Sequence, residues 1–178
     1  WLSAEDARRL EPHLTADLRG AVHFSGDHHL NNERLAEAWA QAVAQHGATV
    51  QTGVTVNEAR IANGKVTAVR IGEEWVNTNT VVIAAGSWSQ EVGAIFGLSI
   101  PIQPAKGQML TACFPPLRYV VSWSDHYLVP RKNGEVVIGS TVEFVGHDKS
   151  VTLETVQAII ERAVDLVPEV RTAPLHRF

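Results

Sequence analysis

Hydrophobic residues recur at intervals of three and four in two stretches of the chain. The first stretch begins at Asn32, a residue type favoured at helix N-termini, and ends at Gly47, which is typical of a helix C-terminus. The second runs from Leu153 to Val167 and is closed by Pro168. Each stretch predicts an amphipathic helix.

The N-terminal residues predict a short helix and then a strand. Residues 3–6, Ser-Ala-Glu-Asp, are similar to a capping box, and Pro12 helps to end the helix that follows. Residues 21–24, Ala-Val-His-Phe, are expected to form the strand.

Several further strands are expected to pair with their neighbours along the chain. Residues 50–61 and 65–71 flank Asn63-Gly64, a hairpin signal because both turn positions tolerate positive φ. Later strands are expected at residues 107–113, 119–122, 127–130 and 136–140, the last two joined through Asn133-Gly134. These strands predict a second, mostly antiparallel sheet.

The apolar run at residues 80–84 predicts a different kind of strand. It leads through Ala85 and Gly86 into a helical stretch that begins at Ser87 and ends near Phe96. A continuous apolar run of this kind is typical of a strand buried in a sheet that is covered on both faces. The elements together predict an α+β fold, in which a mostly antiparallel sheet with helices is combined with part of an α/β domain.

Composition narrows the class of protein. The chain has 178 residues, of which 45% are hydrophobic, and this is enough for one or two compact domains. Because 15 Lys and Arg face 19 Asp and Glu, the net charge of -4 gives no global attraction to nucleic acid or to an anionic membrane. No apolar run approaches the roughly 20 residues of a membrane helix, so we expect a soluble protein.

The cysteine count and the two termini add two expectations. The single cysteine, Cys113, excludes an internal disulfide framework and favours a reducing compartment, hence the cytoplasm, although one thiol is also compatible with many secreted enzymes. The chain begins at Trp1 and stops at Phe178 without a polar tail, so we expect it to be a fragment of a longer protein.

Small residues between Val82 and Trp88 are the first candidate for a cofactor site. At the carboxyl end of a buried strand, such residues let a planar or phosphorylated cofactor approach the backbone. The same small residues would also be found in a tight turn without a cofactor, where Gly86 is needed only for its backbone conformation. No two of the 13 glycines are spaced as G-x-G, so the chain contains neither a dinucleotide fingerprint nor a Walker-type phosphate loop. A flavoenzyme that includes this chain is expected to take its phosphate loop from other sequence.

A family resemblance emerges when six motifs are considered in order. They are Gly-Asp-His-His-Leu-Asn-Asn-Glu-Arg-Leu at 26–35, Thr-Gly-Val at 52–54, Ala-Ala-Gly-Ser-Trp at 84–88, Pro-Ala-Lys-Gly-Gln at 104–108, Tyr-Leu-Val-Pro-Arg at 127–131 and Ile-Gly-Ser-Thr at 138–141. In this order and spacing, the chain resembles the FAD-dependent amino-acid oxidases of the glycine oxidase, sarcosine oxidase and D-amino-acid oxidase group. The resemblance spans essentially the whole chain.

The resemblance implies FAD as the cofactor and assigns its contacts. Family members present a backbone valine to the adenine, and the equivalent here is Val54, although Gly53 stands where a proline is often found. The element that lies against the cofactor corresponds to Ala84, Ala85, Gly86 and Trp88.

Tyr127 is the residue that the resemblance places in the substrate pocket. A hydroxyl on a rigid ring can bond a substrate carboxylate without burying a charge. A half-buried tyrosine that only packs in the sheet remains an alternative for Tyr127, and Arg131 could equally face solvent. The arginine that would bind the carboxylate is expected beyond Phe178, so no catalytic residue is assigned within the chain.

Other residues give weaker signals. His28 and His29 point to opposite sides of an extended segment and have no Cys or carboxylate cluster beside them, so no metal site is expected. Trp39 and Trp75 are interpreted as packing residues, and Cys113 as a small hydrophobe.

The domain organisation and function follow from the resemblance. Residues 1–50 are expected to belong to the FAD-binding domain and its connection, residues 51–100 to FAD-domain strands, and residues 101–178 to the substrate domain. The expected reaction is oxidation of the amine of a small amino acid to an imine, with the isolated chain inactive. Two alternatives stay open, namely a non-catalytic binding or assembly module and a flavin dehydrogenase that uses an acceptor other than oxygen. The identity of the amino acid and the formation of a homo-oligomer also stay open.

Overall fold

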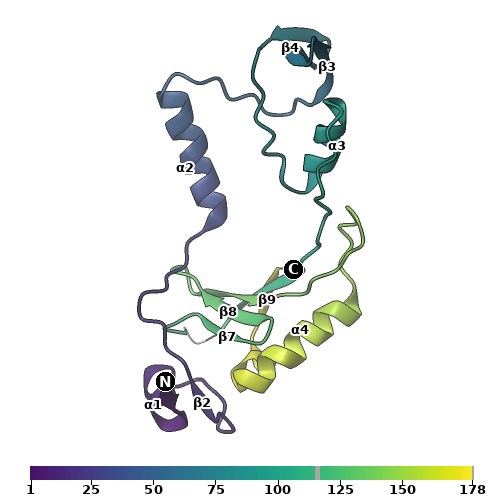
Figure 1. Cartoon of the computed structure of the whole chain (residues 1–178). Coiled ribbons are helices and arrows are strands. Elements are labelled where there is room, and N and C mark those ends of the chain that lie inside the picture. The colour runs from purple at the N-terminus through teal and green to yellow at the C-terminus, as the bar shows by residue number, and fades with distance from the viewer. Residues whose placement is uncertain (115–116, 178) are drawn as a thin grey trace. The chain divides into compact units, whose positions relative to one another are not determined.

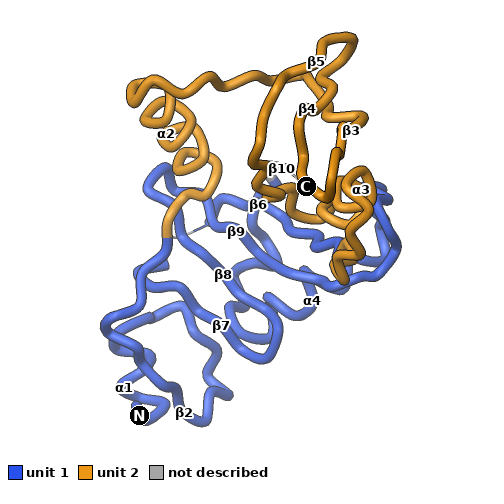
Figure 2. The backbone as a smooth tube through the Cα atoms, turned by 45° about the horizontal axis from the view of Figure 1, so that its top comes forward, with its two compact units in different colours: residues 1–29, 105–178 blue, residues 30–104 orange. Residues whose placement is uncertain are grey.

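The computed structural model describes residues 1–114 and 117–177 and divides the chain into two compact units (Figures 1 and 2). Unit 1 comprises Trp1–His29 and Ala105–Phe178, and unit 2 comprises Leu30–Pro104. These divisions differ from the boundaries expected near residues 50 and 100. The first 29 residues belong with the C-terminal part because their hydrophobic side chains, such as Leu14, pack against its core.

Unit 1 is built on a five-stranded antiparallel sheet in the order β10-β6-β9-β8-β7. The strands are β6 (Met109–Cys113), β7 (Val121–Trp123), β8 (His126–Pro130), β9 (Glu135–Gly139) and β10 (Leu175–Arg177). The four strands expected in this part of the sequence are confirmed, with β7 displaced by two residues at its start. Only β10 was not expected, since three residues after a proline are too few to show alternation.

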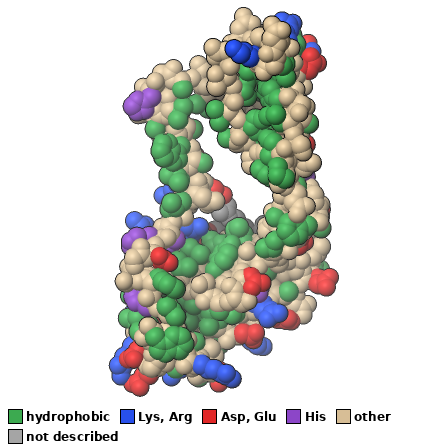
Figure 3. All heavy atoms as spheres, in the orientation of Figure 1, with side chains coloured by type: hydrophobic (Ala, Val, Ile, Leu, Met, Phe, Trp, Pro, Cys, Tyr) green, Lys and Arg blue, Asp and Glu red, His purple; other side chains and the backbone are tan. Residues whose placement is uncertain are grey.

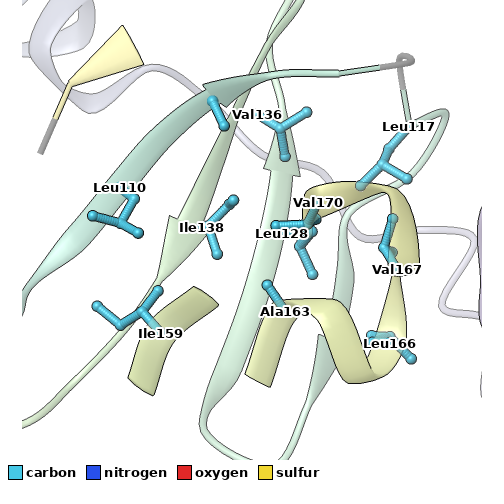
Figure 4. Packing of buried hydrophobic residues seen from close by; sticks show 11 residues of the cluster. Leu110, Leu117, Leu128, Val136, Ile138, Ile159, Ala163, Leu166, Val167 and Val170 are labelled. Carbon is cyan, nitrogen blue, oxygen red and sulfur yellow. The ribbon is translucent and has the colours of Figure 1, made fainter. Parts of the chain in front are cut away.

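Helix α4 (Leu153–Leu166) covers one face of this sheet, and the two elements enclose the core of unit 1 (Figure 4). The hydroxyl of Thr152 caps the helix by accepting from the backbone N–H of Thr155 at 3.3 Å. The core residues alternate along the strands and recur along the helix, as expected for packed faces; they are Leu110, Ala112, Leu117, Leu128, Val136, Ile138, Ile159, Ala163, Leu166, Val167 and Val170. The predicted amphipathic helix is therefore confirmed.

The N-terminal part of unit 1 contains α1 (Ala4–Leu10) and the short strands β1 (Leu2–Ser3) and β2 (Gly20–Ala21). Ser3 caps α1 as predicted, because its hydroxyl accepts from the N–H of Asp6 at 3.1 Å. The strand expected at 21–24 is wrong beyond its first residue, since β2 pairs only with the two residues of β1. The buried carboxylate of Glu11 accepts from the N–H of Arg118 at 2.6 Å and ties α1 to the segment before β7.

Unit 2 contains a three-stranded antiparallel sheet in the order β3-β4-β5. The strands are β3 (Val56–Ala62), β4 (Lys65–Ile71) and β5 (Glu74–Asn77). Asn63 and Gly64 have φ values of 51° and 73°, which confirms the predicted hairpin turn. The first strand begins at Val56 rather than at residue 50, and β5 was not expected.

Helix α2 (Asn32–Gln45) confirms the first amphipathic pattern, with a cap one residue earlier than expected. The side chain of Asn31 accepts from the N–H of Arg34 at 3.0 Å and so takes the N-cap position. No residue of α2 is buried, and hydrophobic side chains lie on its surface (Figure 3). The hydrophobic stripe of this helix therefore has no covering element among the described residues.

The buried strand predicted at residues 80–84 is wrong in this structure. The segment is irregular, and the side chain of Val82 is 84% exposed. A strand needs a hydrogen-bonded neighbour, and no described segment pairs with these residues. The short 3-10 helix Gly86–Trp88 and α3 (Ser89–Ile95) follow, as the helical pattern predicted.

Candidate substrate and cofactor sites

Tyr127 lies in β8, near the middle of the sheet of unit 1. Its neighbour Leu128 is fully buried beneath α4, and alternation along the strand places Tyr127 on the opposite face. Tyr127 is half-buried there. Among the described residues, its hydroxyl has no hydrogen-bond partner. The tyrosine therefore combines a packed ring with a hydroxyl that is available to a ligand.

On β6, β9, β8 and β7 the sheet face around Tyr127 carries two rows of uncharged residues, and the register of β10 adds Arg177 opposite Thr111 at the end of the second row. In the first row, Met109, Gly139, Tyr127 and Ser122 lie directly opposite one another across β6, β9, β8 and β7. In the second row, Thr111, Val137 and Val129 lie directly opposite one another across β6, β9 and β8. Such a surface suits a flat apolar group or a small ligand, with the phenol as a polar group that can orient it.

Arg131 follows β8 and belongs to the turn toward β9. Its backbone N–H donates to the carbonyl of Glu135 at 2.7 Å, and its own carbonyl accepts from the N–H of Gly134 at 3.1 Å. Four residues along a strand separate the Cα atoms of Arg131 and Tyr127 by about 13 Å.

A polar cluster, which we call the Lys106 cluster, joins the ends of β6 and β9. The ammonium of Lys106 lies 3.8 Å from the carboxylate of Glu143 and 3.4 Å from that of Asp148. Thr141 and Gln108 each donate a hydrogen bond of 2.7 Å to the same oxygen of Glu143. Backbone hydrogen bonds in both directions between Lys106 and Glu143 fix the two segments to each other.

The hydrogen bonds of this cluster keep its two carboxylates ionised. Those from Thr141 and Gln108, with the nearby Lys106 ammonium, hold the pKa of Glu143 below its usual value. Hydrogen bonds from the hydroxyl and backbone N–H of Ser150, together with Lys106, lower the pKa of Asp148 to about 2. Sequence reasoning missed this cluster, although the motif at 104–108 contains two of its members.

The residues assigned to the cofactor all lie in unit 2 and are largely exposed. Val54 precedes β3, and Trp88 at the end of the 3-10 helix is 51% exposed. Ala84 is exposed and Ala85 is half-buried. Gly86 has a φ of 54°, a conformation that favours glycine, and a β-carbon built on it would meet no atom within 4 Å.

This turn passes a simple test of fit to a flavin. Apolar side chains and open backbone lie together at residues 84–88, with space over the glycine, as a flat aromatic ring system requires. The open space also shows that packing within the described residues does not require Gly86, whereas its positive φ does favour glycine.

The weaker candidates differ in how they are placed. His28 and His29 are exposed, and the described residues contain no group of His, Cys, Asp and Glu that could hold a metal ion. Trp75 lies beneath the guanidinium of Arg60 at 3.9 Å, in agreement with a packing role. Trp39 is exposed on α2, so its expected packing role has no partner among the described residues. None of the helices that the structure describes has the length and apolar character of a membrane span.

Comparison with known proteins gives matches over the whole chain. The family model described as "DAO: FAD dependent oxidoreductase" matches residues 1–178. The hydrogen cyanide synthase subunit HcnC of Pseudomonas aeruginosa is 35% identical over 99% of this chain and 43% of its own length. The glycine oxidase of Geobacillus kaustophilus is 32% identical over 97% of this chain and 47% of its own length.

Solved structures of glycine oxidases are similar to this chain, as the sequence relatives are. The crystal structure of glycine oxidase from Geobacillus kaustophilus superposes with a TM-score of 0.92 at 30% identity, covering 99% of this chain and 48% of that one. The glycine oxidase of Bacillus cereus gives 0.90 at 30% identity. These likenesses confirm the mixed α+β fold. The chain spans about half the length of the curated relatives named above.

Proposed function

The chain belongs to the DAO family of FAD-dependent oxidoreductases, and we propose that it acts as part of a longer flavoenzyme that oxidises the amine of a small amino acid. Glycine, sarcosine and small D-amino acids are the proposed substrate class. The product is an imine, which water hydrolyses. The observation that carries this proposal is the likeness to glycine oxidases at 30% identity or more over nearly the whole chain.

When bound, FAD would supply the acceptor for the hydride, a proton with two electrons, that leaves the substrate α-carbon, while a second proton leaves the amine nitrogen. The residues of unit 2 would hold it. The exposed turn at 84–88 offers the open backbone of Gly86 and the apolar side chain of Trp88, and Val54 would contribute a backbone contact to the adenine. No charged side chain of the turn itself would need to be desolvated when such a ring system binds.

Tyr127 is the proposed substrate-binding residue, and its role is orientation. Its hydroxyl can donate a hydrogen bond to the carboxylate of the amino acid, while the uncharged rows around it exclude water from the α-carbon. The phenol carries no charge of its own and holds a carboxylate more weakly than a cation does, so we propose that a cation from another part of the enzyme completes the subsite. Residues 101–178 with the N-terminal segment would thus form the substrate domain.

We also propose that these 178 residues alone do not catalyse the reaction. They contain no G-x-G spacing, and backbone amides of such a loop at a helix N-terminus supply much of the anchoring of a dinucleotide pyrophosphate. The half-length match to the curated relatives supports the same view.

The test uses a protein of full family length that contains these residues. The purified protein is mixed without oxygen with glycine, sarcosine, D-alanine or, as a substrate without an amine, glycerol 3-phosphate. Bleaching of the flavin absorbance by at least one amino acid and not by glycerol 3-phosphate is the expected result. Bleaching by glycerol 3-phosphate alone, or a protein without bound flavin, would contradict the proposal.

A further inference from the structure

Gly139 stands directly opposite Tyr127, on the adjacent strand β9. A β-carbon on this glycine would lie 2.9 Å from both Cζ and the hydroxyl oxygen of Tyr127, and 3.1 Å from Cε2. Carbon atoms do not approach so closely without displacement. The hydroxyl end of the tyrosine ring therefore occupies the space that any other residue at position 139 would fill.

A positive φ does not explain the glycine. Nine glycines have positive φ, among them Gly64 and Gly86, whereas Gly139 is not one of them. A glycine inside a strand weakens the sheet, because it has no side chain to pack. What the position gains is the close approach of the aromatic ring to the backbone of β9.

We propose that Gly139 is a positioning residue for the Tyr127 hydroxyl in the substrate subsite. The ring lies across the strand pair and over Gly139, in the row that continues to Met109. This packing holds the hydroxyl close to the sheet, and a ring that is held before binding loses less conformational entropy when it bonds the substrate. The proposal rests on the proposed function, since it assigns Gly139 a role at the same subsite.

The first experiment is a double-mutant cycle in the longer flavoenzyme. Gly139→Ala should raise KM for the amino acid by about the factor produced by Tyr127→Phe, with flavin content unchanged. In a Tyr127→Phe background, Gly139→Ala should have little further effect on KM, because the hydroxyl that it displaces is already gone. Independent, multiplicative effects would overturn the proposal.

The second experiment does not depend on activity. The 178-residue chain contains two tyrosines, so 3-fluorotyrosine labelling gives two ¹⁹F NMR signals, and Tyr127→Phe identifies that of Tyr127. Gly139→Ala should shift this signal and leave that of Tyr119 in place. Gly26→Ala is the matched control, because Gly26 lies in the same unit and its β-carbon would meet no atom within 4 Å. An unmoved Tyr127 signal would overturn the proposal.

The two experiments separate the positioning role from the proposed function. If neither Tyr127→Phe nor Gly139→Ala changes KM, Tyr127 is removed from the substrate subsite, and with it the role of Gly139. If Tyr127→Phe raises KM and Gly139→Ala does not, only the positioning role is overturned. If Gly139→Ala does not fold, the steric explanation predicts that adding Tyr127→Ala restores folding, since the ring that clashes is then absent. Failure of that rescue would overturn the proposal.

Discussion

Leu128 in the sheet of unit 1 is 0% exposed, whereas Val82 in unit 2 is 84% exposed, although both lie in apolar stretches of sequence. Helices α4 and α2 differ in burial in the same way. Each has 14 residues, but α4 buries Ile159, Ala163 and Leu166, while α2 buries none. Unit 1 therefore encloses its own core, and the apolar surfaces of unit 2 lack covering elements among the described residues. The stability of this chain should reside mainly in unit 1, on the side proposed to hold the substrate.

The largest expected effect comes from truncating matched residues on the two helices. Ile159→Ala removes a side chain that is 2% exposed and should cost roughly 2–5 kcal/mol in the free energy of unfolding. Leu35→Ala on α2, where the side chain is 42% exposed, should cost about 0.5 kcal/mol or less. Urea unfolding followed by circular dichroism measures both values. Equal losses would remove the distinction between the units.

A second pair of substitutions separates backbone strain from cofactor binding in unit 2. Gly86 and Gly72 have φ values of 54° and 59°, and a β-carbon on either meets no atom within 4 Å. Leucine at either position should therefore cost a similar strain of about 1–2 kcal/mol. In the longer flavoenzyme, Gly86→Leu should also lower the flavin bound per folded protein, while Gly72→Leu should not. The same occupancy in both variants would return Gly86 to a purely conformational role.

Tyr127→Phe tests the substrate side with a smaller effect. The hydroxyl is proposed to donate to an ionised carboxylate but is only half-buried, so loss of the hydrogen bond corresponds to roughly 1.5 kcal/mol, the lower end for a bond to a charged group, and KM should rise by about twelve-fold. Flavin content should stay as in the wild type, because Tyr127 is not proposed to contact the cofactor. Steady-state kinetics equal to those of the wild type would show that the tyrosine only packs in the sheet.

The smallest expected effect concerns the Lys106 cluster in unit 1. The folded-state pKa of Asp148 is about 2, below the unfolded value of about 3.9, so its contribution to stability is present above about pH 4 and is lost as pH falls toward 2. Asp148→Asn should therefore lower Tm slightly at pH 6 and not at pH 2. Asp165→Asn, which removes an exposed carboxylate from α4, is the control. A Tm difference that persists at pH 2 would contradict this account.

Local signals made part of the fold predictable. Ser3 and the Asn63-Gly64 pair act within a few residues of themselves, so the first helix and the hairpin followed from sequence. The run at 80–84 misled because a hydrophobic pattern shows a tendency to be buried, while a strand requires a partner that the described residues do not supply.

The candidate site was likewise predictable in part. The resemblance identified Tyr127 and the turn around Gly86, because family motifs are local. Spacing could not reveal that Gly139 lies beneath the tyrosine ring, or that Lys106 pairs with Glu143, since both depend on cross-strand register.

FAD titration of the 178-residue chain, followed by flavin fluorescence and a peroxide assay with glycine, sarcosine and D-alanine, tests the central claim most directly. The claim is that the chain holds the substrate sheet and only part of the flavin site. We predict a folded unit 1, no saturable FAD binding at micromolar concentrations and no peroxide. Tight stoichiometric binding or turnover by these residues alone would contradict the account.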